Sequence, residues 1–501
     1  MRLIDLPLEM LDNILDLSLP SGLEGLALSC KAMYERATPQ IRRHNELRRK
    51  WRRTSNHQGQ RIDDTLPILY EISREPIVAE YIEELDLWDD RDRYDDEGII
   101  RAEATAEKFR KGSADSAAVR EMITKSLRSY DADVDARGFW KDTTKADLST
   151  EDEGFAETPY TVIALLSLLP NIHTLRLPSW WVGTELEARA VLEAMVAAVS
   201  GDNRYGRPLS KLKTILPSMH AGYEEKMGLK AFMPLLTLKS LTEVYLVSAV
   251  AVDDGYTGMP FQWTAAPGIA SSLTHIELVS CCMDADGISG LVAHTPALTV
   301  FKYSHETKYH GCQHDWNPGT FAEALAHYCG NTITEVALTI DELYGAIING
   351  ASSFRSFPKL EKLEVDIQVF CGPPVESGQR GGDDAFIPDG DTPWSEHDIP
   401  CIGSMLPVSI REVQINVDNP EPDEEALHAL LKNLKQQRME RLHLLERVII
   451  RQYGGSSALE MATDAGATLE SFDRDLDRRM DMPEWKRKFH DRVRRLEPME
   501  T

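Results

Sequence analysis

The sequence predicts an α/β fold in which an irregular solenoid follows a short N-terminal helical module. The main observation is an apolar triplet at spacing x, x+3, x+5, which recurs ten times along the 501 residues. Segments with helical periodicity lie between the copies, at residues 158–169, 319–328 and 424–434. Residues 4–37 are the most sharply patterned apolar segment of the chain. We therefore expect parallel strands on one face of the solenoid, helices on the other, and three helices at the front.

Composition limits the partners and the compartment. The chain has 81 Asp and Glu against 55 Lys and Arg, a net charge of −26, so its bulk surface should repel nucleic acid and anionic membranes. Seven scattered cysteines are typical of reduced thiols in an intracellular protein. The first residues show no secretory signal, and the best apolar run, residues 160–169, is about half as long as a membrane-spanning helix. We expect a soluble cytoplasmic or nuclear protein, or one found in both, with neither nucleic acid nor membrane as a partner.

Residues 1–45 are expected to form a module of three short helices. Pro7 suits the first position of a helix, and Glu9 favours the positive end of that helix. Residues 21–24 have the form of a capping box that starts a second helix, and residues 31–37 predict a third. The apolar residues of the first helix share one face: Leu8, Leu11, Ile14 and Leu15. Three short helices bury too little surface by themselves, so we expect a partner to cover the excess.

Two motifs in this module carry a family resemblance. They are Leu6-Pro7-x-Glu9-x-Leu11-x-x-Ile14-Leu15 and Leu26-x-Leu28-Ser29-Cys30-Lys31. Together they resemble an F-box, specifically those of the large fungal F-box group. The resemblance implies docking on the Skp adaptor of an SCF-type cullin–RING ubiquitin ligase, and through it on the cullin. The adaptor-facing residues that it implies are Leu6, Pro7, Leu11, Ile14, Leu15, Leu26 and Cys30. Alternatively, the helices only cap the end of the solenoid.

Residues 46–80 are expected to form connecting helices. A basic run at residues 41–53 leads into them, with seven Lys or Arg and one acidic residue. Such a run can be a nuclear-localisation signal or a phosphate-binding patch. The simpler interpretation is the solvated face of a helix whose other side packs through Leu47 and Trp51.

The solenoid is expected over residues 81–450. The copies of the triplet lie at residues 82–87, 172–177, 212–217, 241–246, 273–278, 298–303, 333–338, 360–365, 410–415 and 445–450. The last two apolar positions alternate with a polar one, which predicts a short strand with its apolar side chains facing inward. The pattern resembles leucine-rich repeats, most clearly in LTHIELVSC at residues 273–281. An F-box followed by leucine-rich repeats is also a known family arrangement.

Two insertions and a tail interrupt or end the array. The stretch at about residues 89–157 is acidic and weakly apolar, with helices expected near residues 100–111 and 117–129. Residues 371–398 are rich in Gly, Pro and Asp and predict a long loop. Residues 451–501 are expected to form a helical cap that includes Trp485 and Leu496.

The polar positions of the strands predict a concave surface for binding a target protein. If the register holds, that surface includes Glu84, Asp86, Trp88, Arg176, Tyr245, His275, Glu277, Lys302, Lys362, Glu364, Glu412 and Gln414. Tyr245 and Trp88 are the expected aromatic anchors, because aromatic residues concentrate interface energy. The surface mixes charge signs and has no arginine cluster for a phosphorylated target, so the sequence does not identify the target.

Catalytic signatures are absent from the sequence. It contains no dinucleotide-binding glycine motif, phosphate-binding loop, nucleophile elbow or HExxH motif. Five possible zinc ligands lie close together, but their spacing fits no standard zinc finger: His305, His310, Cys312, His314 and Asp315. A polar loop with ordinary histidines is the better interpretation. Of the adjacent pair Cys281 and Cys282, we expect Cys281 to be the buried cysteine of the repeat and Cys282 to be only its neighbour, since adjacent strand residues face opposite sides.

The sequence thus favours a non-catalytic receptor without cofactor or metal. In this hypothesis the front module binds the Skp adaptor and the repeats bind an unidentified target protein. Two alternatives remain open. One is an interaction scaffold outside ubiquitin pathways, and the other is a metal-dependent enzyme that uses the loop from His305 to Asp315.

Overall fold

The computed structural model describes most of the chain in fifteen ranges. They are residues 3–58, 61–62, 65–88, 100–101, 114–130, 159–179, 181, 186–201, 207–253, 258–264, 271–309, 314–417, 424–453, 457–472 and 482–494. The chain forms two compact units, Met1–Lys213 with Arg495–Thr501, and Thr214–Arg494. In the described ranges, no helix has both the length and the apolar character needed to cross a membrane.

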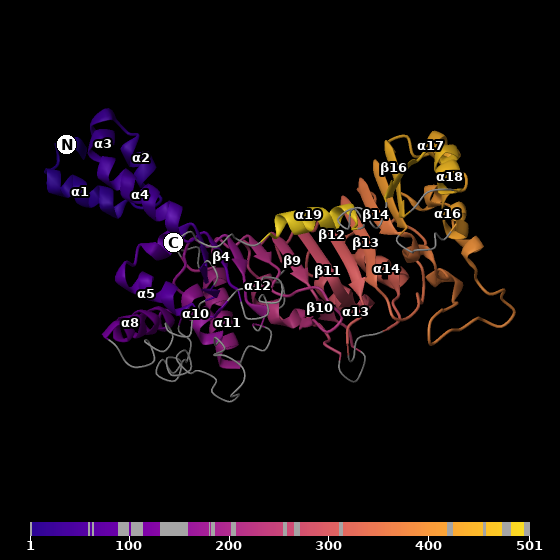
Figure 1. Cartoon of the computed structure of the whole chain (residues 1–501), viewed down its shortest axis with the longest axis horizontal. Helices are drawn as coiled ribbons and strands as arrows, with labels where there is room; N and C mark the ends of the chain where they lie inside the picture. The colour runs from indigo at the N-terminus through magenta and orange to yellow at the C-terminus, as the bar shows by residue number, and fades with distance from the viewer. Residues whose placement is uncertain are drawn as a thin grey trace. The chain divides into compact units, whose positions relative to one another are not determined.

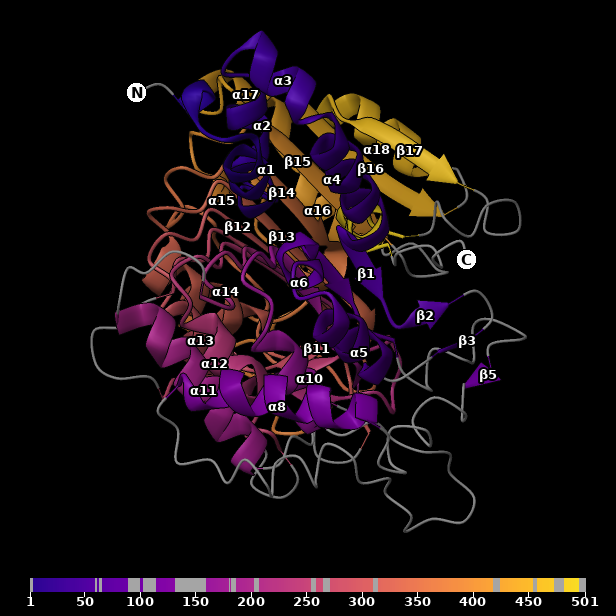
Figure 2. The same cartoon turned by 90° about the vertical axis from the view of Figure 1, so that its left-hand side faces the viewer.

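The first unit begins with a helical module (Figure 2). Its elements are the 3-10 turn Leu3–Asp5 and the helices α1 (Leu8–Leu17), α2 (Leu23–Ala27), α3 (Lys31–Arg36) and α4 (Thr38–Trp51). The buried residues of the module core are Leu11, Leu15, Leu19, Leu23, Ala27, Met33 and Ala37. Pro7 is the N-cap of α1 instead of its first residue. The expected capping box does not form, because Gly22 is the N-cap of α2 and no side chain caps it.

The rest of the first unit mixes helices with a short parallel ladder. Its helices are α5 (Leu66–Arg74), α6 (Val78–Tyr81), α8 (Ala114–Arg128), α10 (Pro159–Leu166) and α11 (Leu186–Gly201). The parallel strands are β1 (Arg53–Ser55), β4 (Glu84–Asp86) and β6 (Thr174–Arg176), and a separate small sheet joins β2 (His57–Gln58), β3 (Arg61–Ile62) and β5 (Ile100–Arg101). The basic run therefore forms part of α4 and enters strand β1, which the sequence analysis had assigned to connecting helices.

The second unit is built on a parallel sheet whose strands follow the chain order (Figure 1). The strands are β7 (Thr214–Leu216), β9 (Glu243–Val247), β11 (His275–Met283), β12 (Val300–Glu306), β13 (Glu335–Glu342), β14 (Lys362–Asp366), β15 (Glu412–Val417), β16 (Arg447–Tyr453) and β17 (Thr468–Phe472). Two short strands, β8 (Met227–Gly228) and β10 (Ala249–Ala251), extend the sheet beside β11. Each of the ten six-residue copies of the pattern contains a strand. Each strand begins at the third of the six residues, for example at His275 in the copy at residues 273–278.

The helices of the second unit lie between successive strands in the chain, except α19, which follows the last strand. They are α12 (Met233–Leu236), α13 (Ala285–Val292), α14 (Pro318–Cys329), α15 (Ile402–Met405), α16 (Glu424–Leu431), α17 (Leu434–Glu440), α18 (Ser457–Ala465) and α19 (Glu484–Arg492). The α/β fold with parallel strands is thus confirmed. Strand β17 was not expected in the C-terminal segment. Of the expected helix at residues 100–111, the structure describes only strand β5, and residues 102–113 lie outside the described ranges.

Candidate functional site

The front module leaves a set of large apolar side chains exposed. Leu17 is 85 % exposed and Leu28 is 68 % exposed, and both lie in or beside the short helices α1 and α2. Among the described residues of the module, the exposed large apolar ones are Leu3, Ile4, Leu8, Met10, Leu17, Leu28 and Tyr34. Burying such side chains gains about 1.5–3 kcal/mol each, so the module has an unused capacity to bind an apolar partner.

The structure divides the implied adaptor-facing residues into three groups. Leu11 and Leu15 are 4 % and 0 % exposed and pack inside the module, so they hold its helices together and do not face outward. Half-buried side chains are found at Leu6, Ile14 and Leu26, whereas Pro7 and Cys30 are exposed. The expectation that the whole α1 stripe faces a partner is therefore corrected. A helix of ten residues has one face for its own core, and Leu8, Met10 and Leu17 lie outside that face.

Polar contacts link the helices of the module. The guanidinium of Arg36 on α3 contacts both carboxylate oxygens of Asp12 on α1, at 2.9 Å and 2.5 Å. The same side chain donates to the carbonyl of Leu8 at 3.2 Å. On α4, Arg43 pairs with Glu75 at 2.7 Å, and His44 contacts the Tyr81 hydroxyl at 2.9 Å. These contacts join the module helices to one another and to α5 and α6.

In the second unit the register aligns the predicted target-binding residues in two rows. One row runs Glu243, His275, Val300, Glu335, Lys362, Glu412 and Arg447, and the next runs Tyr245, Glu277, Lys302, Ala337, Glu364, Gln414 and Ile449. The eight residues predicted for this surface in the second unit lie in these rows: Tyr245, His275, Glu277, Lys302, Lys362, Glu364, Glu412 and Gln414. We call this surface of the second unit the strand face.

Helix α19 covers much of the strand face (Figure 1). The side chains of Trp485, Phe489 and Val493, spaced four residues apart, pack against Tyr245, Val247, Val279 and Ala337. The ring of Phe489 meets Tyr245 edge-on, with centroids 6.1 Å apart, and the indole N–H of Trp485 donates to the Thr339 hydroxyl at 3.3 Å. Tyr245 was expected to be an exposed anchor, but it is buried because this helix lies over it.

Three carboxylates of the strand face receive positive groups from α19. The Asp341 carboxylate bonds to Lys486 and accepts hydrogen bonds from Ser280 and Ser304, both at 2.7 Å. Glu277 contacts Arg492 at 3.1 Å and Lys302 at 3.3 Å. The guanidinium of Arg492 also lies over the ring of Tyr245, 5.4 Å from its centroid, a cation–π geometry.

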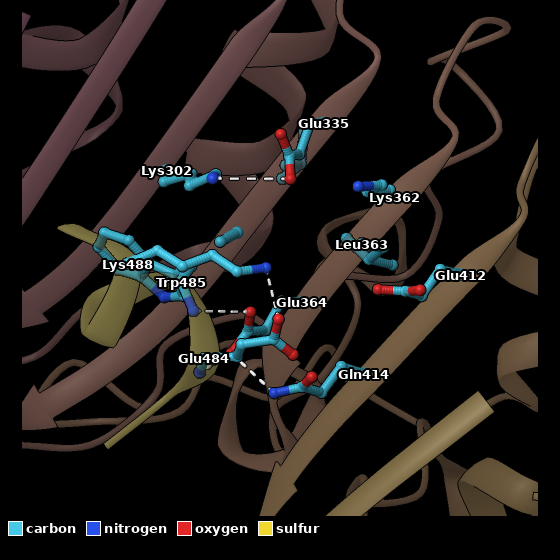
Figure 3. Close-up of a pocket in the computed structure, with 12 residues that line it drawn as sticks. Lys302, Glu335, Lys362, Leu363, Glu364, Glu412, Gln414, Glu484, Trp485 and Lys488 are labelled. Carbon is cyan, nitrogen blue, oxygen red and sulfur yellow. Dashed lines mark hydrogen bonds and ion pairs between the residues drawn. The ribbon is translucent and has the colours of Figure 1, made fainter. Parts of the chain in front are cut away.

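The third carboxylate, Glu364, meets the first turn of α19 (Figure 3). Its two oxygens accept from the backbone N–H groups of Glu484 at 2.7 Å and Trp485 at 3.1 Å, and Gln414 donates to it at 2.9 Å. Such a carboxylate satisfies N–H groups that have no partner within the helix and complements the positive end of the helix dipole. A small hollow adjoins this contact, and Lys302, Lys362 and Glu412 are among its lining residues.

Burial raises the pKa of each of these carboxylates, but their other contacts make the net shift differ. For Glu364, burial is the dominant cause and raises the pKa to about 7, although the N–H groups of Trp485 and Glu484 and the charge of Arg451 oppose it. At Asp341 burial also disfavours the charged form, but Lys486 and the two serine hydroxyls outweigh it and lower the pKa. The pKa of Glu277 is likewise lowered, because His275, Lys302 and Arg492 together outweigh its burial.

The target-binding residues predicted in the first unit are engaged with their neighbours. Arg176 and Asp86 form a buried ion pair at 2.9 Å between adjacent strands. Trp88 stacks on His57, with centroids 4.3 Å apart, and its backbone bonds to the Asn56 side chain. Glu84 pairs with Arg53 at 2.9 Å. The alternation of apolar and polar residues predicts on which side of a strand these residues lie, but not which neighbours contact them. Trp88 is not the exposed anchor that was expected.

The possible zinc ligands that the structure describes, His305, His314 and Asp315, are not gathered in one loop. His305 lies buried on strand β12, stacked on Trp316 and bonded to the Tyr303 hydroxyl at 2.8 Å, and burial lowers its pKa to about 3. The Asp315 carboxylate accepts the backbone N–H of Ala346 at 2.7 Å, whereas His310 and Cys312 lie outside the described residues. In the described part of the chain, no group of three His, Cys, Asp or Glu side chains is arranged to hold a metal.

Comparison with protein-family models and with curated proteins found no match for this chain.

Proposed function

We propose that this protein is a substrate-recognition subunit of an SCF-type cullin–RING ubiquitin ligase. In this proposal the front module binds a Skp-type adaptor, and through it the cullin, while the strand face of the second unit binds a target protein. The observation that carries the proposal is the set of exposed leucines on a module that already has a complete core of its own. The resemblance of the same module to an F-box, in motifs that include the exposed Leu28, gives that surface a specific partner.

The exposed set favours a receptor over a solenoid cap. A terminal cap keeps repeats soluble by presenting a polar outer face. Here Leu17 and Leu28 are exposed although Leu11 and Leu15, from the same short segment, are buried. A receptor of this kind performs no bond chemistry. It raises the effective concentration of a target near a ubiquitin-charged partner.

Capture of a purified Skp-type adaptor by the full-length protein tests the proposal. We expect binding at micromolar concentration or tighter, and a loss of at least tenfold in the Leu17→Asp/Leu28→Asp variant, because both changes place a charge on the exposed apolar surface. Met439→Asp is the matched control, since Met439 is also 68 % exposed but lies on α17 in the second unit.

Circular dichroism should show that all of these proteins keep their secondary structure, because the substituted side chains are exposed. Failure of the wild-type protein to capture the adaptor at micromolar concentration would refute the receptor function. Equal losses from the double variant and from Met439→Asp would show that the module surface is not the binding site.

A further inference from the structure

Helix α19 has the properties of a bound ligand as well as those of a structural element. It follows β17 in the chain, after residues 473–483, and it adds no strand to the sheet that it covers. From β9 to β15, the strands beneath it pair with a neighbouring strand on each side. The backbone ladder of the strand face is therefore complete without α19.

We propose that the strand face is a binding groove for a basic amphipathic helix, and that α19 occupies it as an internal ligand that a target helix displaces. In the complex, side chains of the target helix would take the places of the α19 side chains that contact the strand face. It would carry aromatic residues where α19 has Trp485 and Phe489, an aliphatic residue in place of Val493, and cations in place of Lys486 and Arg492.

The apolar part of the groove selects for helical spacing. Trp485, Phe489 and Val493 recur every four residues, so they line one side of a helix. The strands beneath offer Tyr245, Val247, Val279 and Ala337, and these residues form one buried cluster with the three helix residues. Docking an amphipathic helix through anchors at such intervals is a recurring mode of peptide recognition.

The charged part of the groove selects for a basic helix. Lys486 meets Asp341, Arg492 meets Glu277, and both carboxylates have lowered pKa values, so both are charged at neutral pH. Helix α19 carries four Lys or Arg and two Asp or Glu, a formal charge of +2, within a chain of net charge −26. Charge complementarity of this kind favours cationic partners and raises the rate of encounter.

Glu364 adds a contact that depends on the fold of the ligand more than on its sequence. Its carboxylate accepts backbone N–H groups of the first turn of α19, and every helix N-terminus presents such groups. The groove therefore recognises a helix start at Glu364, three apolar anchors spaced four residues apart, and cations near the start and the end of the helix.

A basic amphipathic helix is thus the class of target for the proposed function. The binding groove depends on the proposed function only because that function makes the helix part of a target protein. The test is a peptide-binding measurement without adaptor. Failure of adaptor capture and failure of peptide binding are therefore separate results.

The test uses the full-length protein and a fluorescein-labelled peptide of residues 482–494, with binding followed by fluorescence anisotropy. In the wild-type protein α19 competes at the high effective concentration of a tethered ligand. The Trp485→Ala/Phe489→Ala variant removes the anchors of the internal helix but leaves the groove unchanged. We expect this variant to bind the peptide at least tenfold more tightly than the wild type does.

Two altered peptides separate specific docking from charge attraction. Lys486→Glu in the peptide should weaken binding at least tenfold, because it faces Asp341. Arg494→Glu makes the same charge change at a residue that is 74 % exposed, and it should change binding less than threefold. Equal weakening by the two substitutions would overturn the proposed groove.

A second variant covers the case in which the double variant does not fold. Lys486→Glu within the full-length chain leaves the three apolar anchors in place and breaks only the pair with Asp341. It should keep the circular dichroism of the wild type and bind the unaltered peptide at least threefold more tightly. The proposal is overturned if Lys486→Glu, or the double variant where it folds, binds the peptide no more tightly than the wild type.

Discussion

The front module and the strand face treat apolar surface in opposite ways. In the module, a 10-residue helix buries Leu11 and Leu15 and leaves Leu17 exposed. On the strand face, a 9-residue helix from the end of the chain covers the sheet, and its Phe489 is fully buried. The chain thus supplies its own helix for one surface and leaves the other open among the described residues. This difference suggests that the module is ready to bind and that the strand face requires displacement first.

The largest expected effect separates the two sides of α1. Leu15→Ala removes a fully buried side chain from the module core, and we expect it to destabilise the module by about 2–5 kcal/mol. Leu17→Ala on the same helix removes an exposed side chain and should change stability by about 0.5 kcal/mol or less. Urea unfolding of the full-length variants, followed by hydrogen exchange of module amides, measures both effects. Similar effects for the two changes would contradict the division of α1 into a buried and an exposed side.

A smaller effect is expected from pH at the contact between Glu364 and α19. The folded protein raises the pKa of this carboxyl from 4.5 to about 7, so it holds the proton more tightly than the unfolded chain does. The stabilisation is fully present below about pH 4.5 and is lost as pH rises through about 7, up to about 3 kcal/mol. We expect the thermal midpoint of the wild type, relative to that of Glu364→Gln, to fall between pH 5 and pH 8.

Glu361→Gln is the control for this measurement. The Glu361 side chain is 53 % exposed, and this residue directly precedes β14, the strand that carries Glu364. Its thermal midpoint should follow that of the wild type throughout the range. A difference between wild type and Glu364→Gln that stays constant with pH would show that Glu364 does not titrate in this interval.

The strands were predictable from the sequence because their signal is local. In LTHIEL, for example, Ile276 and Leu278 alternate with Glu277, and this period of two is enough to predict a strand and its inward side. Parallel pairing follows when such strands recur with helices between them. Strand β17 was missed because its segment lacks the complete triplet.

The cover over the strand face was not predictable in the same way. The spacing of Trp485, Phe489 and Val493 is visible in the sequence and predicts an amphipathic helix. Its packing partner Tyr245 lies about half the chain away, and periodicity contains no information about such long-range contacts. For the same reason, the outward positions of Glu277 and Lys302 were predicted correctly, whereas their burial was not.

The smallest expected effect concerns the ion pair that joins α3 to α1. Arg36 and Asp12 are 29 % and 45 % exposed, so solvent screens their attraction, and we expect Arg36→Ala to cost about 1 kcal/mol or less. Most of this loss should come from the paired hydrogen bonds to the carboxylate, because Arg36→Lys keeps the charge but cannot reproduce the two-point contact. Arg36→Lys should therefore lose nearly as much stability as Arg36→Ala in the same urea measurement. Full retention of stability by Arg36→Lys would show that charge alone, and not the geometry of the pair, orients α3 against the helix that carries the exposed leucines.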